Sequence, residues 1–236
     1  MNFPILSSLI FLPLISSFFI FFSKGKNNNS AIYISLFSSL ATFILSLFIW
    51  FSLDLSSSDF QFLEEKSWIN DFIKFKLGVD GISILFIVLT TFITPICIIS
   101  CINSVKTRIK EFLIAILILE TFMLGVFCSL DLVVFYLFFE AGLIPMFLII
   151  GVWGGPKRVY SAFKFFLFTL LGSVLMLAAI IFIYWLTGTT DITQIYEIKI
   201  PKEYQNILWL AFFSSFAVKM PCLLYTSDAA DDIPGV

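Results

Sequence analysis

Residues 138–149 read FFEAGLIPMFLI, and this stretch places an ionisable carboxylate, Glu140, inside an apolar run long enough to cross a bilayer. Five residues later, Pro145 lacks a backbone N–H, so the carbonyl of Ala141, beside the carboxylate, loses its helical partner. A mid-membrane acid costs about 2.5–3.5 kcal/mol on insertion scales, and such residues are functional candidates by default. We therefore take Glu140 as the residue around which the rest of the chain is arranged.

The composition of the 236-residue chain is typical of an integral membrane protein. Hydrophobic residues make up 60%, charged residues only 13%, and the mean hydropathy is +1.04. A soluble domain could not keep so much apolar surface out of water. The 14 basic and 16 acidic residues form no basic stripe, so we expect no nucleic-acid partner. Histidine, G-x-G-x-x-G and P-loop motifs are absent, so we expect no metal and no cofactor in this chain.

The apolar runs predict an all-α integral membrane protein, a polytopic bundle of about six full transmembrane helices. Residues 112–152 would measure about 61 Å as one helix, twice a bilayer, so this run must fold back at its polar break, residues 129–131. A last apolar stretch, 207–220, is too short for a full span and predicts the first half of a broken seventh helix. The six expected spans are 4–22, 31–53, a third that opens at 78–83 and ends at about 102, 111–129, 131–152 and about 160–186.

The loops between these spans predict an orientation. Loops 23–30, 103–110 and 154–158 hold seven Lys or Arg residues and no Asp or Glu, and they alternate with the mixed-charge loops 54–78 and 188–204. By the positive-inside rule, the first set faces the cytoplasm or matrix and the N-terminus faces outward. The aromatic and charged residues of loop 54–78 indicate a short hairpin on the membrane surface. Asp80, before the third span, is typical of a helix N-cap or first-turn anion.

Four ionisable residues fall within or at the ends of expected spans: Glu140, Glu120, Lys164 and Lys219. Glu120 is either a packing polar residue or a second proton-carrying group, and Lys164 is either a functional group or a snorkelling anchor. Lys219 precedes Pro221 by two residues, which indicates a helix broken beside a charge, a device of transporters. A structural salt bridge between Glu140 and Lys219 is the alternative.

A lysine near Glu140 could control whether this carboxyl holds a proton. Burial favours the neutral form of a carboxyl, and a nearby ammonium favours the charged form. At an effective dielectric constant of ~20, moving a unit charge from ~4 Å to ~8 Å changes the interaction by about 2 kcal/mol. A small displacement of Lys219 relative to Glu140 would therefore suffice to switch the carboxyl between holding and releasing a proton.

Three motifs carry a family resemblance: FYLFFEAGLIPMFLIIGVWGG (135–155), GVDGIS (78–83) and FAVKMP (216–221). With them, residues 1 to about 221 resemble the antiporter-like, proton-translocating subunits of respiratory complex I, the NADH–quinone oxidoreductase. The resemblance implies about fourteen transmembrane helices with two inverted five-helix repeats, each containing a broken helix. The present sequence would be truncated within the first repeat.

By this resemblance, Glu140 matches the carboxylate of the first half-channel, Lys219 the broken-helix lysine that modulates it, and Lys164 the lysine of a KFF motif. The implied function is proton translocation across a bacterial inner or mitochondrial inner membrane, coupled to electron transfer from NADH to quinone in other subunits. NADH, FMN, iron–sulfur clusters and quinone would bind to those subunits. The implied partners are other membrane subunits of complex I, the lipid bilayer and protons.

The resemblance also predicts a division of the chain. Residues 1–110 would form three N-terminal helices with the outward loop, and 111–221 the incomplete first repeat. After Pro221 the sequence reads CLLYTSDAADDIPGV, which departs from the family and which we interpret as a non-native read-through tail at 222–236. A genuine polar C-terminus is the alternative.

Two other functions stay open at this point. The chain could belong to a related multisubunit cation/proton antiporter or a membrane-bound hydrogenase. It could also be a membrane scaffold that moves no protons, in which Glu140 and Lys219 only pair structurally.

Overall fold

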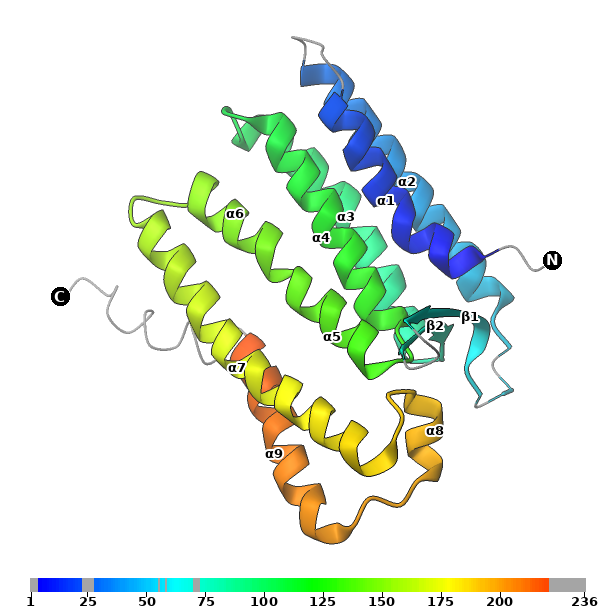
Figure 1. Ribbon diagram of the computed structural model, residues 1–236. Coiled ribbons are helices and arrows are strands. Elements are labelled where there is room, and N and C mark those ends of the chain that lie inside the picture. Colours follow the sequence, from blue (N-terminus) through cyan, green and yellow to red (C-terminus); the bar gives the residue numbers. More distant parts are fainter. Residues whose placement is uncertain (1–3, 23–27, 55, 58, 70–72, 221–236) are drawn as a thin grey trace, which may run out of the picture. The chain divides into compact units, whose positions relative to one another are not determined.

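The computed structural model describes residues 4–22, 28–54, 56–57, 59–69 and 73–220 (Figure 1). It divides into two compact units, the first ending at Ile149 and the second beginning at Ile150, and each is described by itself. The tail at 222–236 and Pro221 lie outside the described residues. The division expected between residues 110 and 111 stays a prediction. It is based on the repeat of a protein family, whereas the two compact units are defined by contacts within the chain.

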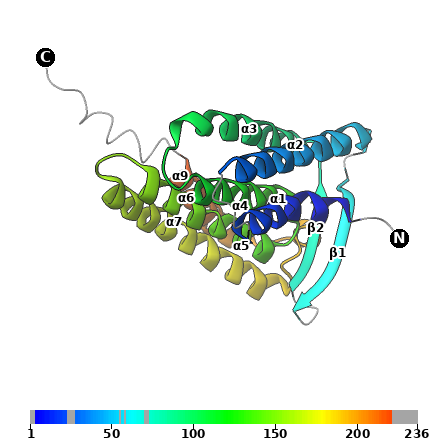
Figure 2. The same ribbon diagram turned by 90° about the horizontal axis from the view of Figure 1, so that it is seen from above.

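The first unit is a bundle of antiparallel helices with one β-hairpin. Its elements are α1 (Ile5–Phe22), α2 (Asn28–Ser52), β1 (Gln61–Ile69), β2 (Ile73–Val79), α3 (Ser83–Ser104), α4 (Ile109–Cys128), α5 (Leu132–Ala141) and most of α6 (Leu143–Trp153). Helix α1 packs against α2 and α4, and α3 packs against α2 and α4 (Figures 1 and 2). Helix α5 continues the bundle by packing against α4.

Six helical stretches of the described chain are long and apolar enough to cross a membrane. They are Ile5–Phe22, Asn29–Ser52, Ser83–Ile102, Ile109–Cys128, Leu132–Trp153 and Arg158–Thr187. The six expected spans are thereby confirmed to within a few residues. The outward side of α2 exposes large apolar side chains such as Phe37, Ile44 and Phe48, as expected where hydrocarbon replaces water as the solvent.

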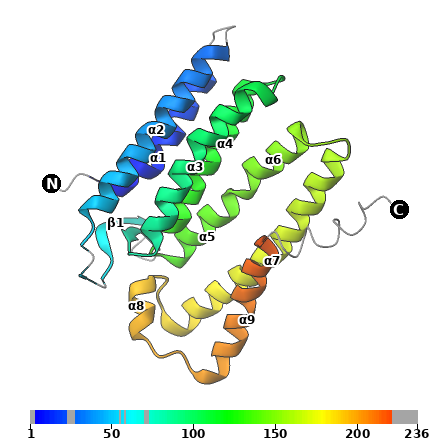
Figure 3. The same cartoon turned by 180° about the vertical axis from the view of Figure 1, so that it is seen from behind.

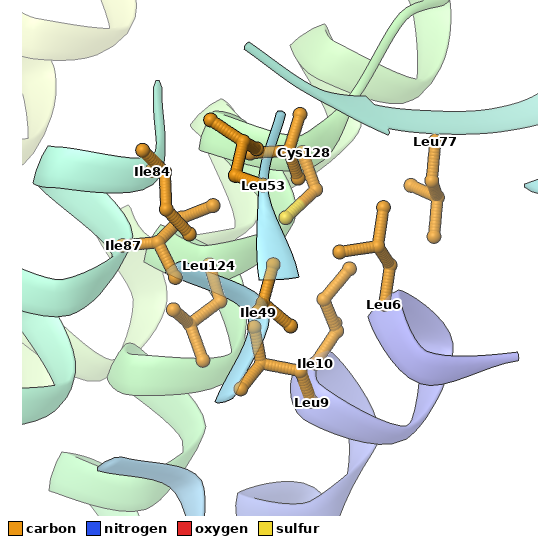
Figure 4. Packing of buried hydrophobic residues seen from close by; sticks show 11 residues of the cluster. Leu6, Leu9, Ile10, Ile49, Leu53, Leu77, Ile84, Ile87, Leu124 and Cys128 are labelled. Atoms are coloured by element: carbon orange, nitrogen blue, oxygen red, sulfur yellow. The ribbon is translucent and has the colours of Figure 1, made fainter. Parts of the chain in front are cut away.

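One buried apolar cluster joins the helices to the hairpin. Leu6 and Leu9 of α1, Ile49 of α2 and Leu124 of α4 are fully buried there, together with Leu77 of β2 (Figure 4). The cluster lies at the end of the bundle that the hairpin covers, so helix packing and hairpin docking depend on the same side chains.

Loop 54–78 forms the expected hairpin, with β1 and β2 antiparallel and Glu64 opposite Leu77. The all-helical expectation therefore holds for the spans, whereas this loop is built of strands. Glu64 docks the hairpin on α1: its Oε1 accepts from the N–H of Leu6 at 2.7 Å and its Oε2 from the N–H of Ser7 at 3.0 Å. Since the first N–H groups of a helix have no partner within the helix, Glu64 acts as an N-cap supplied from a distant strand.

Strand β2 also contacts the turn between α4 and α5. The N–H of Leu130 donates to the carbonyl of Lys76 at 2.9 Å, and a Cβ on Gly78 would lie 2.5 Å from Leu130 Cδ1. A side chain at 78 would therefore require the side chains of Leu130 and Leu63 to shift. Two residues further, Asp80 accepts from the N–H of Ser83 at 2.7 Å, and the Ser83 hydroxyl accepts from the N–H of Asp80. Asp80 thus accepts from the first N–H of α3 from the turn before the helix, whereas the N-cap position itself is Ile82.

The second unit contains α7 (Arg158–Thr187), α8 (Ile192–Glu197) and α9 (Lys202–Lys219). Helices α7 and α9 lie side by side (Figures 1 and 3), and a Cβ on Gly172 would lie 2.9 Å from Val218 Cβ. The region 188–204, expected as a loop, contains the short helix α8, whose N-cap Asp191 accepts from the N–H of Thr193 at 2.9 Å. Helix α9 also begins five residues earlier than the apolar stretch 207–220.

Removal of the Glu64 cap should destabilise the fold. We expect Glu64→Ala to lower the free energy of unfolding by about 1–2 kcal/mol, because two N–H groups of α1 lose their partner. For a chain of this size this corresponds to a fall in Tm of roughly 2–8 °C. Thermal unfolding of the purified protein in detergent measures the change.

The neighbouring Glu65→Ala is the matched control. Glu65 pairs with Lys74 at 2.7 Å on the exposed side of the same hairpin, and such surface pairs contribute about 0–1 kcal/mol. Equal Tm values for the two variants would contradict the capping role of Glu64.

Candidate functional site

The turn between α4 and α5 determines where the helix with Glu140 begins. Asp131 is the N-cap of α5, and its Oδ1 accepts from the N–H groups of Val133 at 2.9 Å and Val134 at 3.2 Å. The predicted break at residues 129–131 is therefore confirmed, and its acid has a structural role. Glu140 follows eight residues after the start of α5, about 12 Å along the helix axis.

The span with Glu140 is divided into two helices just after this residue. Helix α5 ends at Ala141, Gly142 separates it from α6, and Pro145 is buried in the first turn of α6. The N–H of Gly142 still donates to the carbonyl of Phe138 at 3.2 Å. Pro145 has no N–H to offer the carbonyl of Ala141, so the interruption lies at the residue whose carbonyl the sequence expects to lose its helical partner.

The carboxyl group of Glu140 is enclosed by protein without polar contacts. Both of its oxygens are buried, and neither has a hydrogen-bond partner among the described residues. Buried polar groups are satisfied in the large majority of cases, and exceptions call for an explanation. A carboxyl in such surroundings is a candidate for taking up and releasing a proton.

A close contact with α4 fixes the position of α5. The ring of Phe138 lies against Gly125, where an added Cβ would overlap the ring, and it also faces Phe122 at a centroid distance of 6.5 Å. Because Gly125 admits the ring, the two helices approach closely near Glu140. The rotation of α5 about its axis is thus set by packing on α4.

Glu120 lies on α4 at about the same depth as Glu140, eight residues from the end of its helix. Its side chain is 2% exposed, and Oε1 is 3.4 Å from the hydroxyl of Thr42 on α2. Thr94 of α3 is a second polar neighbour of this carboxyl. The structure thus brings Glu120 together with hydroxyl groups of two other helices, a grouping that the sequence analysis missed.

A signal for this grouping exists in the sequence of α2. Ser35, Ser38, Ser39, Thr42 and Ser46 recur at helical spacing, so they share one face of the helix. All five are buried. The spacing alone does not reveal which helix this face contacts.

The two lysines lie on neighbouring helices of the second unit. Lys164 is exposed in the second turn of α7, and Lys219 is the last residue of α9, half-buried beside Val218, which packs on Gly172. Met220 then adopts an extended conformation with ψ 127°, as favoured before a proline. The end of the helix at Lys219 agrees with the expected break, although the half-helix beyond Pro221 lies outside the described residues. The pairing of Glu140 with Lys219 stays a prediction, since the two belong to different units.

An apolar cavity of about 550 Å³ lies in the first unit beside α5, between Phe11, Phe75 and Phe138. Its single charged lining residue is Lys66, and Glu140 does not line it. Among the described residues, no three His, Cys, Asp or Glu side chains gather in a way that could hold a metal ion.

Comparison with known proteins identifies a family. Residues 129–227 match the family model described as "NADH:quinone oxidoreductase/Mrp antiporter, TM". The NADH-quinone oxidoreductase subunit M of Rhodobacter capsulatus is 48% identical over 234 residues, which cover 92% of this chain and 45% of that protein. The NADH-ubiquinone oxidoreductase chain 4 of Marchantia polymorpha is 48% identical over 218 residues, covering 92% and 44%. The chain thus spans about half the length of the curated relatives it matches.

The fold agrees with a solved structure. A chain of respiratory complex I from Thermus thermophilus with bound NADH superposes with a TM-score of 0.79 at 26% identity, covering 92% of this chain and 44% of that one. Both sequence and fold therefore confirm the resemblance carried by residues 135–155. Over residues 129–227 in sequence, and over most of its length in fold, the chain is similar to the NADH:quinone oxidoreductase/Mrp antiporter family of transmembrane proteins.

Proposed function

We propose that this chain is a proton-translocating part of a membrane-arm subunit of NADH–quinone oxidoreductase. The observation that carries the proposal is the buried carboxyl of Glu140, which has no hydrogen-bond partner among the described residues and lies beside an interrupted helix. Buried polar atoms without a partner are rare in proteins and call for an explanation. The proposal rests on this carboxyl and on relatives named as subunits of that oxidoreductase.

In this proposal Glu140 takes up and releases the proton, and Lys219 and Lys164 set the balance between the two states. An ammonium that approaches Glu140 favours its charged form, and an ammonium that withdraws favours the protonated form. The end of α9 at Lys219 supports the role of this lysine, because a charge at a helix end can move with less disturbance than one inside a continuous helix.

The electron-transfer chemistry belongs, in this proposal, to partner subunits that hold NADH, FMN, iron–sulfur clusters and quinone. The partners of this chain are then other membrane subunits of the complex, in a bacterial or mitochondrial inner membrane. A subunit of a related cation/proton antiporter is the alternative that the family description leaves open. The names of the relatives at 46–48% identity favour the oxidoreductase.

The central test replaces Glu140 by Gln in the full-length subunit within the assembled complex. Gln keeps the size of the side chain but cannot exchange a proton. We expect proton pumping in membrane vesicles to fall at least about tenfold, in line with the loss of a group that transfers a proton directly. NADH oxidation coupled to pumping should fall with it, while the complex stays assembled.

The matched control is Glu197→Gln, which changes an exposed carboxyl on α8 and should leave pumping unchanged. Normal pumping in Glu140→Gln would refute the proposal and favour a scaffold in which the carboxyl has only a structural role.

The proposed orientation has its own test, by cysteine labelling in a background without the native cysteines. We expect Ser57→Cys, in the exposed segment before β1, to react with a membrane-impermeant maleimide from the outward side. Gly155→Cys, in the exposed turn before α7, should react only after the membrane is permeabilised. This pattern follows from the basic residues of the inward loops, and the reverse pattern would place the N-terminus inward.

A further inference from the structure

The buried hydroxyl face of α2 and the carboxyl of Glu120 belong to one polar cluster between α2, α3 and α4. Thr42 Oγ1 is 3.4 Å from Glu120 Oε1, and one turn along α2 the hydroxyl of Ser46 is 2.8 Å from that of Thr91 on α3. Two atoms of the cluster have no hydrogen-bond partner among the described residues, Glu120 Oε2 and Ser38 Oγ. Each belongs to a side chain that is only 2% exposed.

The elements around Glu120 supply no cation to balance a carboxylate. Helices α1, α2 and α3 contain no Asp, Glu, Lys or Arg, and α5 contributes another acid, Glu140. The lysines of β2 are far from Glu120, because β2 contacts the chain at Ser129, after the end of α4. On α4 itself, Lys110 and Glu111 lie in the first turn, about 14 Å away along the axis. An ionised Glu120 would thus be an unpaired charge in the bundle, which is strongly unfavourable.

The hydroxyl groups of Thr42 and Thr94 each have a backbone carbonyl of their own helix within 3.0 Å. Thr42 has one hydroxyl hydrogen, and its oxygen lies nearer to the carbonyls of Ser38, at 2.9 Å, and Ser39, at 3.0 Å, than to the carboxyl of Glu120. The hydroxyl of Thr94 donates to the carbonyl of Thr90 at 2.9 Å. At 3.4 Å the Thr42 hydroxyl can donate to an ionised Glu120, and its oxygen can accept from a protonated one, because a carboxylic acid can donate to a lone pair whereas a carboxylate cannot.

We propose that α2, α3 and α4 enclose a second proton-binding site of this subunit, in which Glu120 carries the proton and donates it in a hydrogen bond to the hydroxyl of Thr42. Thr42 and Thr94 are positioning residues for this acid. The site rests on the proposed function, since it adds a second proton carrier to the translocation path of Glu140. It differs from that site in its helices and in its hydroxyl neighbours.

The test uses the complete complex, with infrared difference spectroscopy and proton pumping as readouts. The wild-type complex should show a carboxylic acid C=O band that Glu120→Gln lacks. The control Glu111→Gln, on an exposed residue of the same helix, should retain the band. Thr42→Val keeps the side-chain shape but removes the acceptor, so it should shift the band, and Thr42→Ser should restore its position. A structural role of Glu120 alone would not produce this pattern.

Pumping separates the two proposals. We expect Glu120→Gln to lower the pumping rate at least about threefold, a part of the effect usual for a direct proton carrier. A band retained in Glu120→Gln, or a pumping rate equal to the wild-type rate, overturns the second site. If Glu140→Gln stops pumping while Glu120→Gln does not, only the present inference fails; normal pumping in Glu140→Gln removes the proposed function itself. Should Glu120→Gln not assemble, the Thr42→Val and Thr42→Ser pair decides through the band position.

Discussion

Hydrocarbon cannot accept or donate hydrogen bonds, and this constraint governs the spans of the chain. Every backbone N–H and C=O in the bilayer must find its partner within the protein, which leaves helices as the solution for a chain of this kind. The hydroxyl groups of the spans follow the same rule. Thr42, Thr91 and Thr169, for example, donate to carbonyls one turn earlier in their own helices.

Two helix ends beside ionisable side chains can be explained by this constraint. Gly142 separates α5 from α6 directly after Glu140, and α9 ends at Lys219. The interruption at Gly142 and the end of α9 each precede a proline closely, and each lies beside an ionisable side chain. Irregular backbone at membrane depth is tolerated where protein or a hydrated path surrounds it, so these two places are where a membrane protein can keep a charge. The proton chemistry proposed for Glu140 and Lys219 is located there for that reason.

The hairpin shows how a polar segment supports an apolar bundle. Glu64 caps α1, Lys76 accepts from the N–H of Leu130, and Leu77 is buried in the cluster that joins α1, α2 and α4. These contacts tie the start of the first helix to the turn before α5. Asp131 in that turn is the N-cap of α5. The hairpin therefore also stabilises the end of the bundle at which the helix with Glu140 begins.

The sequence by itself determined the spans, their polar break at residues 129–131, the hairpin and the carbonyl of Ala141 that Pro145 leaves without a partner. These features depend on hydropathy, on proline and on capping residues, which act over a few neighbouring positions. The tertiary structure alone decided that Glu64 caps α1, that Gly125 admits the ring of Phe138 and that Glu120 meets Thr42. Glu64 and Leu6 are 58 residues apart, and Thr42 and Glu120 are 78 apart. Such contacts depend on how each helix is rotated toward its neighbours, and in helices that are apolar on nearly every side the hydrophobic pattern does not fix that rotation.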